Sequence, residues 1–146
     1  MLWQLVAGGA ISFVNFLIHA AVAALIMVTT RHAAAATDDL HRFVQLMTLL
    51  TLTIVALTIA HLVEISVWAL FYSVAGIDPG QGIHAFEWAF ENYTALGYGD
   101  AVPPPGLRLY GPITALNGLL LIGLSVFIIF EVMRMGEIEI RRKDRD

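Results

Sequence analysis

Charged residues are absent from three long parts of the chain. These uncharged stretches are residues 1–30, 43–63 and 109–130. A helix that spans a bilayer needs about 20 predominantly apolar residues, so the pattern predicts three membrane-spanning helices. We expect them over approximately residues 3–29, 41–75 and 110–134. The second is longer than the hydrocarbon layer and is therefore expected to tilt or protrude.

A shorter apolar pattern lies between the second and third spans. The turn-forming cluster at residues 76–80 is predicted to end the second helix. Residues 84–93 then have the apolar spacing of a short helix, which is much too short to cross a membrane. Pro112 fits the first turn of the last helix, and Gly136 is predicted to end that helix before a charged tail.

Composition excludes a water-soluble enzyme. Of the 146 residues, 58% are hydrophobic and 14% are charged, and the mean hydropathy is +0.76. A soluble domain of this length does not bury so much apolar surface. No nucleophile–base constellation or metal-ligand set indicates catalysis, so we expect an all-α membrane protein that is not an enzyme. The first span is expected to be a retained helix, because its apolar run is far longer than that of a signal peptide.

The charged residues limit the expected partners and predict the orientation in the membrane. The net charge of −4 provides no basic surface, so no nucleic acid is expected as a partner, and the absence of cysteine excludes disulfides. Basic residues gather in the loop after the first span and in the C-terminal tail, with Arg108 alone between the other two spans. The positive-inside rule therefore predicts an external N-terminus and a cytoplasmic C-terminus. Aromatic residues near the external ends are expected to anchor the spans in the interface: Trp3, Trp68, Phe71 and Tyr72.

Candidate chemistry lies in the segment Glu91–Asp100, between the second and third spans. We expect an extended, glycine-containing strand after the short helix, at membrane depth. Backbone carbonyls there are tolerated only where they line a watery cavity or bind something. Rings of carbonyl oxygens suit K⁺, because they replace its hydration shell. Gly97 and Gly99 accept the left-handed torsions needed when successive carbonyls point along one axis.

The sequence Gly97-Tyr98-Gly99-Asp100, preceded by Thr94-Ala95-Leu96 and a short helix, resembles the selectivity filter of potassium channels. Residues 61–133 resemble the small prokaryotic channels of the two-helix pore family that carry an additional N-terminal helix. The resemblance implies three spans, a re-entrant pore helix and a homotetramer in the cell membrane of a prokaryote. Its partners would be lipid, K⁺ as permeant ion and further copies of itself, without a cofactor.

The resemblance also divides the chain and assigns roles within it. Residues 1–40 would be the additional helix with its loop, 41–135 the pore domain and 136–146 a short charged tail. Potassium would bind to the filter carbonyls of four consecutive residues, with Gly99 completing the outer mouth: Ala95, Leu96, Gly97 and Tyr98.

Four further residues would support the filter by the same resemblance. Thr94 matches the last threonine of the pore helix, and Trp88 matches an aromatic residue whose indole N–H braces the filter tyrosine, here Tyr98. Glu91 and Asp100 have the spacing of a carboxylate pair behind the filter, which would share one proton.

Ala95 departs from the family pattern, which has threonine at this position and so adds hydroxyl ligands to the innermost site. Two other functions therefore stay open: a pore that conducts Na⁺ and K⁺ alike, and a non-conducting membrane subunit that binds a partner. Because extended backbone accepts a β-branched residue, we expect Ala95→Thr to fold well.

Ionisable residues inside the spans leave alternatives open. His61 and Glu64 share one face of the second span, and they form either a proton-sensitive pair that modulates the filter or a hydrogen-bonded structural pair. We favour the structural pair, because buried polar groups are usually satisfied in packing. Two ligands are too few for a metal site. Asn15 and His19 on the first span are expected to form interhelical hydrogen bonds.

Two features of the last span also have two interpretations. Gly118 and Gly123 are either gating hinges or positions of close helix packing. Glu131 either forms a cation-concentrating ring in the tetramer or pairs with Arg134, and we favour the pair.

Overall fold

The computed structural model describes residues 1–36, 42–77, 84–97, 103 and 105–143. These residues form helices and no strand. In chain order the helices are α1 (Leu2–Ala36), α2 (Arg42–Val74), α3 (Ala85–Tyr93) and α4 (Tyr110–Lys143). Helices α1, α2 and α4 each contain a stretch that is long and apolar enough to cross a membrane. The chain is therefore an all-α membrane protein with three candidate spans, as the uncharged stretches predicted.

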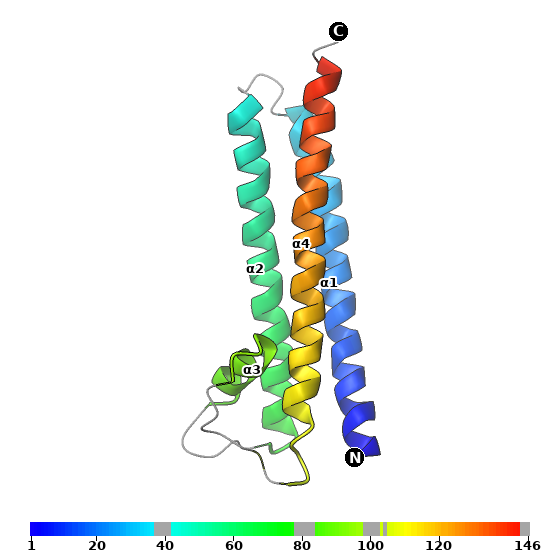
Figure 1. Ribbon diagram of the computed structural model, residues 1–146, viewed down its shortest axis with the longest axis vertical. Coiled ribbons are helices and arrows are strands. Elements are labelled where there is room, and N and C mark those ends of the chain that lie inside the picture. The colour runs from blue at the N-terminus through cyan, green and yellow to red at the C-terminus, as the bar shows by residue number, and fades with distance from the viewer. Residues whose placement is uncertain (37–41, 78–83, 98–102, 104, 144–146) are drawn as a thin grey trace.

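The three long helices run side by side, and α3 packs across α2 and α4 near one end of the bundle (Figure 1). The N-terminus lies at the same end as α3. The C-terminal ends of α1 and α4 and the N-terminal end of α2 lie at the opposite end (Figure 1). The N-terminus therefore shares one end of the bundle with α3, and which end faces outside stays a prediction.

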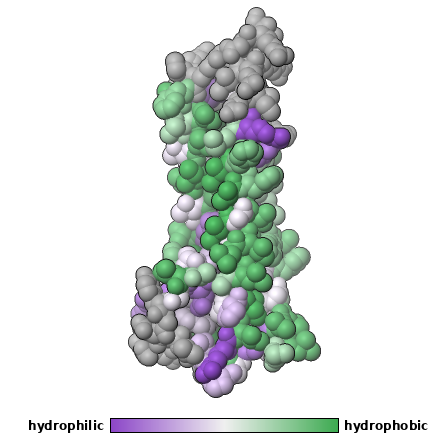
Figure 2. Space-filling model, in the orientation of Figure 1, coloured by the Kyte–Doolittle hydropathy of each residue, from purple (hydrophilic) through white to green (hydrophobic). Residues whose placement is uncertain are grey.

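The outer surface of the bundle is largely apolar. Hydrophobic side chains cover most of the central part of the face in Figure 2. Large apolar residues are more than half exposed on all three long helices, among them Phe13, Leu17, Leu52, Ile59, Val126 and Phe127. Such a surface suits lipid or neighbouring helices rather than water, because contiguous exposed apolar patches on soluble proteins are small.

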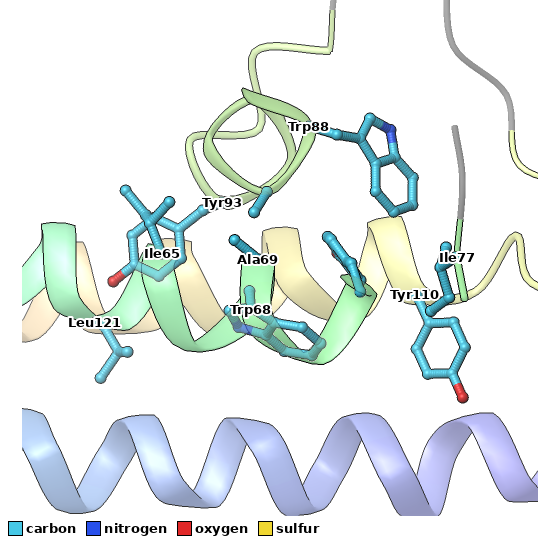
Figure 3. Packing of buried hydrophobic residues seen from close by; sticks show 10 residues of the cluster. Ile65, Trp68, Ala69, Ile77, Trp88, Tyr93, Tyr110 and Leu121 are labelled. Carbon is cyan, nitrogen blue, oxygen red and sulfur yellow. The ribbon is translucent and has the colours of Figure 1, made fainter. Parts of the chain in front are cut away.

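Two clusters of buried hydrophobic residues hold the helices together. The first includes residues of α2, α3 and α4 near the α3 end, and Figure 3 shows Trp88 and Tyr93 leaving α3 in opposite directions along α2. The second lies nearer the other end and consists of Ile26, Leu49, Leu57, Ile128 and Val132. Residues between the two clusters therefore lie near the middle of the bundle.

Two predicted helix ends are wrong. Helix α1 continues to Ala36 rather than ending near residue 29, because the run Ala33–Ala36 consists of the strongest helix-forming residue. Helix α4 continues through Gly136 to Lys143. A Cβ atom at Gly136 would lie 3.1 Å from Cδ1 of Leu46, so this glycine lies at a close contact between α4 and α2.

Two of the predicted interfacial anchors are also wrong. Trp68 and Tyr72 are 0% exposed and belong to the first hydrophobic cluster. The Tyr72 hydroxyl hydrogen-bonds with the Thr114 hydroxyl of α4, and the Trp68 indole likewise bonds to α4. Their polar atoms therefore have partners inside the bundle. Trp3 is exposed near the N-terminus, as an interfacial residue requires.

Candidate functional site

Helix α3 ends in a left-handed turn at Ala95. Tyr93 is the last residue of α3, Thr94 is its C-cap, and Ala95 follows with φ 56°. The backbone N–H of Ala95 donates to the carbonyl of Asn92 at 2.9 Å, and the N–H of Leu96 donates to the carbonyl of Glu91 at 3.0 Å. This pair of bonds is the Schellman motif, in which glycine usually occupies the left-handed position. Ala95 therefore has a strained conformation rather than the extended one expected from the sequence.

Gly97 also has a positive φ, of 48°, as its predicted place in the filter required. Leu96 lies between Ala95 and Gly97 and does not have a positive φ, so the sign of φ alternates over these three residues. All three are exposed, and a Cβ atom at Gly97 would meet no described atom within 4 Å. This short segment is therefore not packed against the described remainder of its own chain.

Several predicted filter residues lie outside the described residues: Tyr98, Gly99 and Asp100. The pairing of Glu91 with Asp100 and the bracing of Tyr98 by Trp88 consequently stay predictions. Trp88 itself is buried against Tyr72, with ring centroids 4.4 Å apart, and it ties α3 to α2.

A polar cluster surrounds the carboxylate of Glu64, which is 0% exposed. Its Oε1 lies 2.9 Å from Nδ1 of His19 on α1, and its Oε2 lies 3.0 Å from Nδ1 of His61 on α2. The hydroxyl of Tyr93, at the end of α3, donates a hydrogen bond to the same Oε2. One carboxylate thus connects three helices.

His61 extends this cluster to the fourth helix. Its Nδ1 lies 2.8 Å from the Tyr93 hydroxyl oxygen, and its Nε2 lies 2.8 Å from Oγ of Ser125 on α4. The structural interpretation of His61 and Glu64 is therefore supported by contacts with both α1 and α3. Tyr93 and Ser125 could not be assigned to this cluster from the sequence, because only the folded chain places them opposite His61.

A second group of polar side chains lies one turn further along the bundle. The amide of Asn15 donates to Oδ1 of Asn117 at 3.0 Å and to the backbone carbonyl of Glu64 at 3.2 Å. The indole of Trp68 donates to the same Oδ1 of Asn117 at 2.9 Å. The prediction that Asn15 and His19 form interhelical hydrogen bonds is confirmed.

The cluster around Glu64 separates the two hydrophobic clusters. On α2, His61 lies between Leu57 of one cluster and Ile65 of the other. On α4, Ser125 likewise lies between Leu121 and Ile128. Intramembrane ionisable residues at such positions are candidates for function.

Gly118 lies at a close contact between α4 and the end of α3. A Cβ atom at Gly118 would lie 2.0 Å from the backbone oxygen of Tyr93, so this glycine allows α4 to contact the end of α3. A Cβ atom at Gly123 would meet no described atom within 4 Å. Further along α4, Arg134 donates to Glu131 at 2.6 Å, which confirms the predicted pair.

These features define a multi-pass membrane protein in which a short helix and an exposed turn of alternating φ are inserted between two spans. The family model described as ion channel matches residues 47–135, which is more than half of the chain. The chain therefore belongs to the ion channel family. No significant match was found among curated proteins or among solved structures. The matched residues include α3 and most of α2 and α4, and they exclude α1.

Proposed function

We propose that the protein is a potassium-selective channel that conducts K⁺ passively through a pore formed by four copies of the chain. Each copy would contribute carbonyl groups from residues 95–99 to rings that replace the hydration shell of the ion. Because one chain supplies one such segment, a cyclic homotetramer completes the pore.

The observation that carries this proposal is the alternation of φ at Ala95, Leu96 and Gly97. Residues that alternate between left-handed and right-handed torsions direct successive carbonyls to the same side. In a regular strand, successive carbonyls point to opposite sides. The segment also follows directly on α3, whose C-terminal end carries the negative end of the helix dipole and so favours a cation.

Exposure of the segment supports the tetramer. Leu96 lies in the segment between two apolar spans, and its side chain is 57% exposed in the single chain. Backbone at membrane depth needs a watery cavity or a protein partner, and a central pore shared by four copies provides both.

Ala95 is the observation that favours a second candidate, a pore of the same architecture that conducts Na⁺ and K⁺ alike. The alanine supplies no hydroxyl to the innermost ion site, so that site has fewer oxygen ligands than the family pattern provides. The two candidates differ in their reversal potential when K⁺ and Na⁺ are placed on opposite sides of the membrane.

The direct test is ion flux from liposomes that contain the purified full-length chain. We expect K⁺ efflux that exceeds Na⁺ efflux and a particle whose mass corresponds to four chains. Equal fluxes of K⁺ and Na⁺ would favour the second candidate over a potassium-selective channel. Liposomes that release neither ion, with the tetramer intact, would favour a non-conducting subunit.

A further inference from the structure

No lysine or arginine side chain among the described residues lies near the carboxylate of Glu64. All lysines and arginines of the sequence lie outside residues 1–30, 43–107 and 109–133, so the spans bring none to this depth. A buried carboxylate without a positive partner is costly, and such groups either pair or coordinate a metal ion. The groups that do surround Glu64 are two imidazoles and one phenol.

These groups form a set of metal ligands. One ligand atom each from His19, His61 and Glu64 lies within 4.8 Å of the other two. Imidazole nitrogen and carboxylate oxygen are typical ligands of Zn²⁺ and of neighbouring transition metals, whereas Mg²⁺ and Ca²⁺ prefer oxygen alone. The sequence had shown only two of the three ligands, because the third comes from α1.

The ligand atoms lie close enough together to converge on one metal ion. Zinc bonds to nitrogen and oxygen are about 2.0–2.1 Å long, so neighbouring ligand atoms in a tetrahedron are about 3.3 Å apart. The Glu64 oxygens lie 2.9 Å and 3.0 Å from the nearest nitrogens of His19 and His61. Each of these two separations is therefore within a few tenths of an ångström of the metal-bound value, and the three ligand atoms together lie within 4.8 Å of one another.

The surroundings also orient the ligands. A histidine that binds metal usually donates its other ring N–H to an oxygen. His61 has this arrangement, because its Nε2 lies 2.8 Å from Oγ of Ser125. His19 is 2% exposed, and its Nε2 has no hydrogen-bond partner among the described residues. Only one of its two ring nitrogens therefore has a partner in the described part of the chain.

We propose that His19, His61 and Glu64 form a binding site for one divalent transition-metal ion of the Zn²⁺ type per chain. Ser125 positions His61, and Tyr93 provides an oxygen beside the open coordination position. Because the ligands come from α1 and α2, the bound ion fixes the additional helix to the pore domain. The 19% exposure of the His61 side chain gives the site an entry path from the surface of the chain.

The test is Zn²⁺ binding to the full-length chain in detergent, without a histidine tag, measured by equilibrium dialysis and by the change in melting temperature. We expect one Zn²⁺ per chain and a rise in melting temperature that grows with Zn²⁺ concentration. His19→Gln and Glu64→Gln should each lower the affinity at least about 100-fold, whereas Ser125→Ala should lower it roughly 10-fold. Both glutamine variants keep an amide that can hydrogen-bond in place of the lost group.

Matched controls are His32→Ala and His84→Ala, which remove exposed histidines and should leave the stoichiometry unchanged. Binding that falls in these controls and persists in folded His19→Gln would overturn the proposal. So would a wild-type chain that binds no Zn²⁺ at concentrations up to about 1 mM, the weak end of specific affinities. Neither result depends on ion conduction, so failure here is separate from failure of the proposed function.

Discussion

The hydroxyl of Tyr93 donates a hydrogen bond to the buried carboxylate of Glu64 and joins the end of α3 to the middle of α2. Tyr93 is the last residue of α3 and precedes Ala95, the first residue of the proposed filter, by two positions. The carboxylate is therefore connected to the proposed filter through the Tyr93 side chain and two residues of backbone. A change at Glu64 is expected to act on the filter through this connection.

Tyr93→Phe tests the energetic value of that bond. The substitution removes the hydroxyl and leaves Oε2 of Glu64 with one donor fewer, so we expect a loss of stability of about 1–2 kcal/mol. Thermal unfolding in detergent measures it. The matched control is Tyr110→Phe, since the Tyr110 ring is buried and its hydroxyl has no partner in the described part of the chain. Equal losses in both variants would show that the hydroxyl contact is not what matters.

Gly118→Ala is expected to destabilise the fold, and Gly123→Ala is not. A methyl group at Gly118 would lie 2.0 Å from the Tyr93 backbone oxygen and would push α3 away from α4, at a cost of about 1–3 kcal/mol. At Gly123 the added methyl group meets no described atom within 4 Å, and alanine is the better helix former by about 1 kcal/mol. Unfolding curves of the two variants give the comparison. The reverse order would contradict the α3–α4 packing.

Substitutions of Ala95 are expected to follow its left-handed backbone. Ala95→Gly should stabilise the end of α3 by about 1 kcal/mol, because glycine carries no Cβ penalty at positive φ. Ala95→Thr should destabilise it, because a β-branched residue is poorly accommodated there. The sequence had suggested that the threonine variant folds well, on the assumption of extended backbone. Melting temperatures in the order glycine, alanine, threonine would agree with the structure.

Gly97→Ala is expected to abolish K⁺ flux if the proposed filter is correct. The introduced Cβ conflicts with a φ of 48° and turns the carbonyl away from its neighbours. Gly76→Ala is a matched control, because Gly76 has a φ of 64°, similarly open surroundings and a place at the end of α2. Liposome flux should fall in the first variant only, while both lose similar stability. Loss of flux in both would point to misfolding rather than to the filter.

The orientation predicted from the basic residues has its own test. The chain contains no cysteine, so one introduced at exposed His84 or exposed His32 is a unique label site. An impermeant thiol reagent applied to intact cells should label His84→Cys from outside and should not reach His32→Cys until the membrane is opened. Labelling of His32→Cys alone would reverse the assigned orientation.

The sequence predicted the spans well, because each follows from a local property. The uncharged stretches place the starts of α2 and α4 within a few residues of their actual positions, and the turn-forming cluster at residues 76–80 does the same for the end of α2. Errors came where local signals compete with packing. Gly136 looked like a helix end, yet its missing side chain serves the contact with Leu46. Trp68 looked like an interfacial residue, yet its indole has a partner in Asn117.

The polar cluster could be predicted only in part. The three-residue spacing of His61 and Glu64 places both on one helical face, and this follows from periodicity alone. The position of His19 beside them depends on how far α1 slides along α2, which no spacing within either helix encodes. The left-handed φ of Ala95 has a similar origin, because it comes from how α3 ends and not from an intrinsic preference of alanine.

The family match begins at residue 47, after α1 has ended, yet Asn15 and His19 of α1 have their partners inside the matched region. Synthesis proceeds from the N-terminus, so both side chains enter the bilayer before Glu64 and Asn117 exist to receive them. During synthesis His19 therefore lacks its partner until α2 has been made, and Asn15 lacks Asn117 until α4 has been made. A shortened gene that encodes only the family region would yield a chain whose buried carboxylate has permanently lost one of its two histidines.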